Sequence, residues 1–382
     1  MKYNKVPIFD LADWKNGLAF KQFAFSDNGK PIIKIAELKN GVSSQTSFTQ
    51  QEFDKSVYLT KGDLLFSWSG NPETSIDVFW YNLPDGWLNQ HIFKVTPKDG
   101  VNKVYLYYLL KYLKPEFTAI ASNKQTTGLG HVTVKDLKEL TVSLPDLEHQ
   151  TQIGKYLSMI DQAIRTNQKI NDNLLAQAQT LYKQFFPYSV QDDLPDGWRI
   201  GTVGEIIEIH DSKRIPLSGA DRAKMEKKIY PYYGAASLMD FVDNYIFDGK
   251  YLLLGEDGTV VDDAGYPILQ YVWGQFWVNN HAHILTGRLG YDVESLYMLF
   301  KQTPVKSIVT GAVQPKISQA NLRSIQVVIP PEYNLREYND LVEPLFSLFR
   351  ANEEECKTLT ALRDTLLSKL MSGEIDVSAV QL

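Results

Sequence analysis

A pentad of the form Trp-x-Asn-x-His occurs twice in the chain, 190 positions apart. Residues 87–91 read WLNQH, and residues 277–281 read WVNNH. Repetition over this distance has two explanations: a chemical site that is built twice, or a duplicated fold that carries the pentad as part of its scaffold. Because an internal repeat fixes the architecture of the whole chain, the sequences on either side of the pentads decide between them.

The sequences around the two pentads match in the same order. Upstream, GDLLFSWSG (62–70) corresponds to KYLLLGEDG (250–258), and both are apolar runs that end in a polar glycine turn. Downstream, residues 126–146 correspond to residues 309–331, since each has a Thr-Gly turn, a leucine and an alternating strand that ends at proline. A long stretch with helical periodicity follows each strand. The sequence therefore predicts two copies of one unit.

The elements within each copy indicate a mixed fold. Short runs of β-branched and aromatic residues alternate with Gly, Asn and Pro turns, which is typical of strands. Residues 104–113 and 293–303 have the apolar spacing of short helices. We therefore expect an α+β fold: two pseudo-repeated α/β target domains of roughly 140 residues, each with a twisted, mostly antiparallel sheet, separated by two long helices that form an antiparallel coiled coil.

The same order of elements gives the predicted boundaries. They are 1–146 for the first domain, 147–190 for the first helical spacer, 191–331 for the second domain and 332–382 for the second helical spacer. A chain of 382 residues is too long for one ordinary core, which agrees with this division.

Both spacers carry apolar residues at heptad spacing. The alternating steps of four and three predict a helix-packing seam at Ile153, Leu157, Ile160, Ile164, Asn167, Asn171, Leu174 and Leu181, and at Leu341, Leu345, Leu348, Asn352, Leu359, Leu362 and Leu366. Each helix would exceed about 50 Å at 1.5 Å per residue, which is longer than a small domain is wide. We expect the two seams to pack on each other with the asparagines fixing the register. The alternative is that each stripe packs on the body of its own domain.

The distribution of charge matters more than the net charge of −6. Residues 332–382 hold ten acids and five bases, a net of −5, so that the rest of the chain sums to −1. Residues 211–228 hold six bases and three acids. A local basic cluster of this kind is the usual footprint of a nucleic-acid partner, although surface lysines are more often simply solvated. The candidate contacts are Lys213, Arg214, Arg222, Lys224, Lys227 and Lys228 in the second domain, and Lys30, Lys34, Lys124 and Gln125 in the first.

A search of the sequence for a catalytic or metal-binding constellation gives none. The chain has no phosphate-binding P-loop motif, and GLG at 128–130 lacks the third glycine of a dinucleotide fingerprint. Cys356 lies on the acidic helix, where a reactive thiolate is not expected. His281 and His283 would share one face of a strand, but no carboxylate is spaced to join them, and the first copy has Phe93 at the second position. We therefore expect no catalytic residue and no metal site in this chain.

The pentad itself is then best interpreted as scaffold. The tryptophans fill a core, and the asparagines and histidines bond to neighbouring backbone or water. The alternative, a chemical site built twice, is less favoured, because Trp, Asn and His alternate along one face of a strand and form an amphipathic edge rather than an acid/base pair.

Composition points to the cytoplasm. A single cysteine excludes a disulfide framework, and no apolar run is long enough to span a membrane. Asp10 and Asp13 stand where a signal peptide needs its apolar stretch.

Several segments together resemble one known family. Residues 145–164 (PDLEHQTQIGKYLSMIDQAI) resemble the Pro-Pro-Leu-x-Glu-Gln-x-x-Ile junction of the specificity subunits of type I restriction-modification enzymes. LPDGWRIGTVGEI (194–206) resembles the opening of their second recognition domain, YPYYGAAS (230–237) their Pro-x-Tyr-Gly-Ala turn, and LLSKLMSGEIDV (366–377) their C-terminal helix ending. GDLLFSWSG (62–70) resembles their Gly-Asp-Ile-Leu strand. The resemblance covers the whole chain in order.

The sequence departs from that pattern in two places. The second junction, PPEYNLREYNDL (330–341), lacks the Glu-Gln pair, and the first domain has no Pro-x-Gly-Trp opener.

The resemblance implies a DNA sequence-specificity subunit that is not itself an enzyme. Each domain would be a target-recognition domain that reads one half of an asymmetric bipartite double-stranded DNA target. The helices would set the spacing and dock two methyltransferase (modification) subunits, and restriction/translocase subunits would join for cleavage of foreign DNA such as that of phage. S-adenosylmethionine, ATP and magnesium would belong to those partners, with no cofactor in this chain.

Two other interpretations stay open at this level. One is a coiled-coil scaffold whose domains bind proteins rather than DNA. The other is a solitary half of a fused nuclease-methyltransferase, which would need a catalytic segment that the sequence does not contain.

Overall fold

The computed structural model describes residues 4–21, 24–125, 128–311 and 313–377. The chain divides into two compact units, of which the first comprises Met1–Thr166 and Glu355–Leu382 and the second Asn167–Glu354. Each unit therefore contains one domain and a part of each long helix. The boundary falls inside the helices, so the four-segment division of the sequence stays a prediction. Among the described residues, no helix is both long and apolar enough to cross a membrane.

The first domain is built from two four-stranded sheets and two short strand pairs. One sheet has the order β2 (Ala12–Asn16), β10 (Ile92–Pro97), β6 (Leu64–Ser67), β8 (Asp77–Trp80). The other has the order β4 (Phe48–Thr49), β3 (Lys30–Ile33), β9 (Gly86–Leu88), β5 (Tyr58–Leu59). The short pairs are β1 (Asn4–Pro7) with β12 (Thr141–Leu144), and β7 (Ser69–Gly70) with β11 (Gly130–His131).

Short helices connect these strands. They are η1 (Ile8–Leu11), α1 (Ile35–Asn40), η3 (Lys55–Val57), α2 (Pro72–Ser75), α3 (Lys103–Tyr112), α4 (Lys114–Asn123) and α5 (Val134–Glu139). Helix α3 matches the helix predicted at 104–113, and its buried face joins the main core of the unit. The Thr-Gly turn predicted at the start of 126–146 lies partly outside the described residues, because 126 and 127 are not among them.

The second domain repeats the arrangement. Its sheets have the orders β14 (Ile207–Ile209), β21 (Ala282–Gly287), β18 (Tyr251–Gly255), β19 (Leu269–Val272), and β16 (Leu238–Val242), β15 (Tyr230–Tyr233), β20 (Gln275–Val278), β17 (Phe247–Asp248). A further pair joins β13 (Arg199–Thr202) to β22 (Gln326–Ile329). The helices are α7 (Val203–Ile206), η4 (Asp211–Lys213), α8 (Gly219–Ala223), α9 (Val293–Phe300), η5 (Lys306–Ile308) and α10 (Gln319–Arg323).

The orders of both four-stranded sheets, and the pair β1–β12, have counterparts in the second domain, which confirms the predicted duplicated fold. The pair β7–β11 corresponds there to the isolated bridge between Asp257 and Lys316. The predicted, mostly antiparallel pairing is confirmed among the described strands, but the expected single sheet is corrected to two, one of which contains a parallel pair in each domain. In that pair, Trp87 lies opposite Ile32 and Trp277 lies opposite Tyr232. The direction of pairing could not be predicted, because the spacing of apolar residues does not depend on which neighbour a strand selects.

The pentads lie at the same point of this repeated topology. Trp87 is fully buried and Trp277 nearly so. The backbone N–H of Asn89 donates to the carbonyl of Ile33 at 3.0 Å, and that of Asn279 donates to the carbonyl of Tyr233 at the same distance. The tryptophan and asparagine of the pentad therefore serve the fold.

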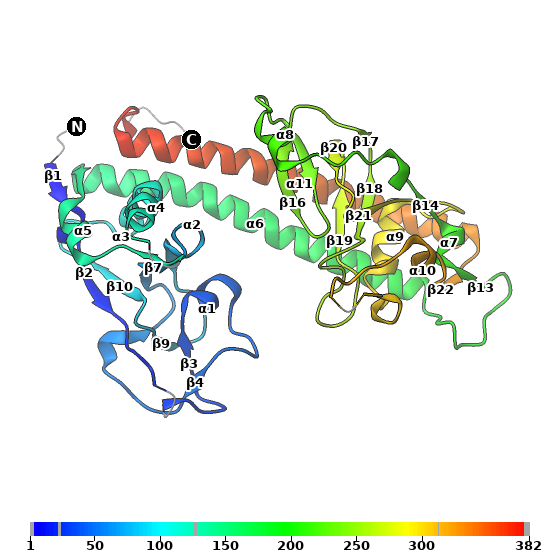
Figure 1. The fold of residues 1–382 in the computed structure, drawn as a ribbon, viewed down its shortest axis with the longest axis horizontal. Coiled ribbons are helices and arrows are strands. Elements are labelled where there is room, and N and C mark those ends of the chain that lie inside the picture. Colours follow the sequence, from blue (N-terminus) through cyan, green and yellow to red (C-terminus); the bar gives the residue numbers. More distant parts are fainter. Residues whose placement is uncertain (1–3, 22–23, 126–127, 312, 378–382) are drawn as a thin grey trace. The chain divides into compact units, whose positions relative to one another are not determined.

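The two spacers are the helices α6 (Leu147–Phe185), of 39 residues, and α11 (Glu332–Ser372), of 41 residues (Figure 1). In the first unit the N-terminal part of α6 packs on the C-terminal part of α11. There Arg363 forms an ion pair with Asp161 at 2.9 Å, and the cysteine thiol of α11 contacts the carbonyl of Ile164. In the second unit the remaining halves meet, and the hydroxyl of Tyr338 donates to the carbonyl of Ala178 at 3.2 Å. The helices thus pack in antiparallel directions.

Apolar side chains of the two helices meet in two buried clusters, one in each unit. Ile160 and Ile164 of α6 form one buried cluster with Cys356 of α11. Closer to the domains, both helices also pack on the domain cores. Ile153 and Leu157 join the core of the first domain, and Tyr182 joins a cluster with Met298 of the second. Both alternatives from the sequence are therefore realised, each over a different part of the helix.

The predicted seam of α6 lies on the packed face, since Leu174 is buried and Asn167 and Leu181 are half-buried. The predicted seam of α11 is partly wrong. Its residues that lie on the packed face are Leu345, Asn352, Leu359 and Leu366, whereas Leu341, Leu348 and Leu362 are between 43% and 48% exposed.

The error comes from following leucines alone. Val342 and Phe346 are buried, each one position after a predicted leucine, and so is Tyr338, which lies one heptad before Leu345. Large aromatic side chains bury more apolar surface than leucine, so they determine which face of α11 turns inward.

Asparagine forms the polar layer that the sequence predicted. Asn352 donates its side-chain N–H to the Oδ1 of Asn171 at 2.9 Å, and Asn171 donates to Glu353 at 2.8 Å. Both asparagines are more than nine-tenths buried. A buried polar pair favours the one register in which its hydrogen bonds are made.

Candidate nucleic-acid interface

The basic candidates of the first domain already have partners within the domain. Lys30 forms an ion pair with Glu52 at 2.8 Å, and this hydrogen bond raises the pKa of the lysine. Lys34 donates to the hydroxyl of Ser47 at 3.2 Å, and Lys124 pairs with Asp136. Among the four predicted contacts, Gln125 is exposed.

The basic cluster of the second domain is divided by the structure into two groups. Arg222 pairs with Asp240 at 3.0 Å and lies over the ring of Tyr232, and Lys228 is 3.6 Å from the same carboxylate. Arg214 is largely buried in a separate ion cluster. These three side chains hold the domain together and offer little free charge.

The remaining three candidates are Lys213, Lys224 and Lys227. All three are exposed, and none forms an ion pair with another described residue. Lys213 ends the short helix η4, whereas Lys224 and Lys227 lie between α8 and β15. They are the side chains of the predicted set that are best suited to bind phosphate.

Exposed apolar side chains lie close to these lysines along the chain. They are Ile215, Ile229, Leu238, Met239, Phe241 and Tyr245, each at least 36% exposed. Three of them stand on β16, which is the edge strand of its sheet. Sequence reasoning missed this group, although the apolar run LMDF (238–241), directly after the predicted turn at 230–237, was a signal. Apolar groups so placed are typical of an interaction surface.

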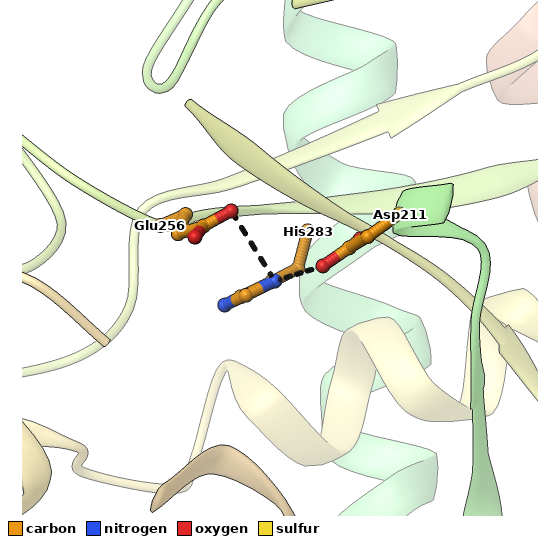
Figure 2. Close-up of side chains that lie close together, drawn as sticks. All are labelled: Asp211, Glu256 and His283. Atoms are coloured by element: carbon orange, nitrogen blue, oxygen red, sulfur yellow. Dashed lines mark hydrogen bonds and ion pairs between the residues drawn. The ribbon is translucent and has the colours of Figure 1, made fainter. Parts of the chain in front are cut away.

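A second feature that sequence reasoning missed is a buried group of charged side chains in the second domain. Figure 2 shows Asp211, Glu256 and His283, which come from the ends of the neighbouring strands β14, β18 and β21. The Nδ1 of His283 lies 2.6 Å from Asp211 and 3.7 Å from Glu256. The guanidinium of Arg214 closes the group, at 2.6 Å from Glu256 and 3.4 Å from Asp211. We call these four residues the ion cluster.

The hydrogen bonds of the ion cluster fix its protonation. The Nε2 of His283 faces the carbonyl of Ile317 at 2.8 Å, and a carbonyl can only accept, so Nε2 carries a proton. Burial alone would raise the pKa of both carboxyl groups. Hydrogen bonds from His283 to Asp211 and from Arg214 to Glu256 outweigh that effect, so that both pKa values lie below their ordinary range. The Nδ1 of His283 faces the Oδ2 of Asp211 at 2.6 Å, so both ring nitrogens of this buried histidine meet protein acceptors.

Three of these residues could in principle hold a metal ion, because one ligand atom of each lies within 4.8 Å of the others. The expectation that no carboxylate is spaced to join His283 is wrong, since two carboxylates reach it from positions far away along the chain. However, both ring nitrogens of His283 face protein acceptors, and a metal ligand needs a free nitrogen lone pair. The arrangement acts as a structural ion network.

The equivalent positions of the first domain carry a neutral group. The strand pairing places Asn16, Trp68 and Phe93 where the second domain has Asp211, Glu256 and His283. The indole N–H of Trp68 donates to Asn16 at 3.0 Å, and the rings of Trp68 and Phe93 lie 5.7 Å apart. One fold therefore accommodates either an ion network or an aromatic cluster at this point.

Comparison with known proteins identifies the family. The family described as Type I restriction modification DNA specificity domain matches residues 1–176 and 195–361. The type I restriction enzyme MjaIX specificity subunit of Methanocaldococcus jannaschii is 24% identical over 375 residues, which covers 84% of each chain. The putative type I restriction enzyme specificity subunit S.HindORF215P of Haemophilus influenzae is 31% identical over 127 residues, 33% of this chain and 32% of that protein.

A solved structure has the same fold. The crystal structure of a type I restriction-modification system S subunit from M. genitalium aligns with a TM-score of 0.59 at 19% identity, over 97% of this chain and 96% of that one. The chain belongs to the family of type I restriction-modification DNA specificity subunits.

Proposed function

We propose that each domain of this specificity subunit reads one half of an asymmetric bipartite DNA target. The proposal rests on one observation: the two domains share a fold but expose different side chains. The orders of the four-stranded sheets are the same, yet the exposed apolar side chains differ: they are Ile229, Leu238, Met239 and Phe241 around β15 and β16, but Phe25 and Val42 around β3 and β4. A common fold places contact residues at the same position on each half-site, and different side chains then select different bases.

The second domain offers both kinds of DNA contact. Lys213, Lys224 and Lys227 are free to neutralise phosphates, which provides affinity without sequence preference. The apolar side chains of β16 suit the methyl group of thymine at a base edge. In the first domain, Gln125 offers a side-chain amide, which hydrogen-bonds well to adenine.

The helices α6 and α11 would hold the two domains at a fixed separation and dock two methyltransferase subunits, with restriction/translocase subunits joining the complex. The net charge of −5 over residues 332–382 suits a protein-docking surface. Catalysis would belong to the partners, together with S-adenosylmethionine, ATP and magnesium, and the complex would act in the cytoplasm.

Charge reversal tests the DNA surface of the second domain. In the assembled complex with methyltransferase subunits, the double variant Lys224→Glu, Lys227→Glu should weaken binding to all duplexes. The slope of log affinity against log salt should fall by about one for each phosphate that the variant no longer neutralises. The matched control is Lys301→Glu, Lys306→Glu, which changes the charge of the same domain equally at two other exposed lysines.

Equal effects of the two double variants would contradict the assignment of this surface. A wild-type complex that binds no DNA but still assembles would support the protein-binding scaffold instead.

A further inference from the structure

The histidine that closes each pentad differs from the other repeated residues because it is exposed. The side chain of His281 is 44% exposed, and His91 is also exposed, whereas Trp87 and Asn89 are buried. Histidine is scarce in this chain, with six among 382 residues. A match of two histidines at equivalent exposed positions therefore calls for a cause.

The fold does not supply that cause. The carbonyl of His91 accepts the N–H of Trp68 at 3.2 Å, and the carbonyl of His281 accepts the N–H of Glu256 at 2.8 Å. These are backbone bonds that any residue could make. They show that the two histidines occupy the same place in the repeat, and they leave the choice of side chain unexplained.

The side-chain contacts within the protein are different in the two domains. The ring of His91 lies 5.8 Å from the ring of Trp68 and 3.3 Å from the side chain of Gln90. The Nδ1 of His281 instead pairs with the carboxylate of Asp257. Within the described part of the chain, no shared internal contact explains the shared imidazole, so the common partner is expected outside the chain.

A second nitrogen-bearing side chain accompanies each histidine. His131 pairs through its backbone with Ser69, and Lys316 forms the corresponding bridge with Asp257. Lys316 is 49% exposed and lies 3.2 Å from Glu256. Lys316 thus lies near Asp257, the partner of His281, and His131 occupies the corresponding backbone position in the first domain.

We infer that His91 and His281 are equivalent contacts to the DNA phosphate backbone, one in each domain. The inference rests on the proposed function, because it requires that each domain faces one half-site. An identical side chain in two domains that read different bases suits a contact that does not discriminate between bases. The phosphate backbone is the part of DNA that is the same in every half-site.

The surroundings of His281 suit this role. The guanidinium of Arg214 donates to the carbonyls of Asn280 and Ala282, on either side of His281, which fixes the turn. The Nδ1 of His281 faces the carboxylate of Asp257, so Nε2 is the ring nitrogen that would meet a phosphate oxygen. Arg214, predicted from the sequence as a DNA contact, is thus a positioning residue for the turn.

The test uses the complex assembled with its methyltransferase subunits. Dissociation constants are measured for a duplex with both half-sites and for one in which both are scrambled. His91→Ala and His281→Ala should each weaken binding to both duplexes by about three- to tenfold, with the ratio of the two constants unchanged. Asn280→Ala, which removes the adjacent exposed side chain, should leave both constants unchanged.

Phosphate ethylation interference locates the contact. For the wild-type complex, ethylation of one phosphate in each half-site should block binding. His281→Ala should abolish that interference in one half-site and His91→Ala in the other. If an alanine variant unfolds, His281→Gln and His281→Leu replace it, and glutamine, which retains a donor, should bind DNA more tightly than leucine.

Unchanged dissociation constants in both histidine variants would overturn the inference. A loss confined to the duplex with intact half-sites would also overturn it, since the histidines would then read bases. A wild-type complex that does not distinguish the two duplexes would instead refute the proposed function.

Discussion

At equivalent positions, the second domain has charged side chains and the first domain has neutral ones. Where three neighbouring strands end, the second domain buries an ion cluster of Asp211, Arg214, Glu256 and His283, with the histidine fully buried. The first domain fills the equivalent space with Asn16, Trp68 and Phe93, which carry no charge.

The central layers of the helix pair repeat this contrast. In the second unit the layer is the hydrogen-bonded pair Asn171 and Asn352, whereas in the first unit it is Ile164 against Cys356. Hydrogen bonds and ion pairs depend on the exact positions of their partners, whereas apolar contacts stabilise a protein over a wider range of arrangements. The second unit should therefore be more sensitive to loss of a single partner.

The largest predicted effect comes from His283→Phe, which places the residue of the first domain in the ion cluster. Asp211 would lose its partner His283 while Arg214 still contacts both carboxylates, and breaking a buried ion network in this way costs about 3–5 kcal/mol. Hydrogen exchange of the β21 amides should show this loss, while the β10 amides keep the wild-type protection.

The control is the triple variant Asp211→Asn, Glu256→Trp, His283→Phe. It places the three neutral residue types of the first domain at the equivalent positions of the second domain. It should recover a substantial part of the protection. Equal protection of β21 in His283→Phe and the wild type would show that the ion cluster is dispensable.

A smaller effect is expected in the helices. Ile164→Ala removes apolar contacts with Cys356 and should destabilise the first unit by about 2–4 kcal/mol. The double variant Asn171→Leu, Asn352→Leu should be neutral or stabilising, since apolar side chains commonly replace a buried polar pair without loss. Urea unfolding followed by exchange of helix amides measures both. If the double leucine variant were less stable than Ile164→Ala, the asparagine pair would contribute more to stability than the apolar contacts of Ile164, which is the opposite of what we expect.

Acid should affect the ion cluster selectively. The pKa values of Asp211 and Glu256 are lowered in the folded state, so the unfolded chain binds more protons in acid. Their contribution to stability is complete above the ordinary pKa values of 3.8 and 4.5 and is lost as the pH falls through the lowered folded values. Between pH 5 and pH 3, β21 should lose protection faster in the wild type than in the neutral triple variant. The same loss in both proteins would mean that other carboxyl groups control the acid response.

The smallest effects belong to the leucines that the sequence misassigned. Leu348→Ala and Leu362→Ala should each change the free energy of unfolding by less than about 0.5 kcal/mol, because both side chains are exposed. Phe346→Ala, in the buried row, should cost about 3–5 kcal/mol. If a leucine variant lowered the free energy of unfolding as much as Phe346→Ala, the packing seam of α11 would lie at the leucines, as predicted from the sequence.

The order of elements could be predicted from the sequence because it depends on local patterns. Matched segments around Trp87 and Trp277 gave the repeat, and heptad spacing gave the two long helices. The ion cluster could not be predicted in this way, since Asp211 and Glu256 reach His283 only after the strands β14, β18 and β21 have paired.

The exposure of individual side chains also depends on packing. Arg214 and Lys213 are neighbours in a basic run, yet one is buried in the ion cluster and the other is exposed. A count of charged residues cannot separate them. The sequence therefore predicted the basic segment of the candidate interface, and the structure identified which of its lysines are exposed.

The central claim is that the paired helices α6 and α11 keep two domains with different DNA specificities at a set distance. The direct test inserts four helix-forming residues into both helices, between Thr166 and Asn167 and between Glu354 and Glu355, so that the pairing of α6 with α11 is preserved. Four residues add about 6 Å, and the rise of DNA is about 3.4 Å per base pair. Sequencing of methylated DNA from cells that carry the complex should show the same two half-sites with a gap longer by about two base pairs. Methylation with the original gap, or with altered half-sites, would contradict the account.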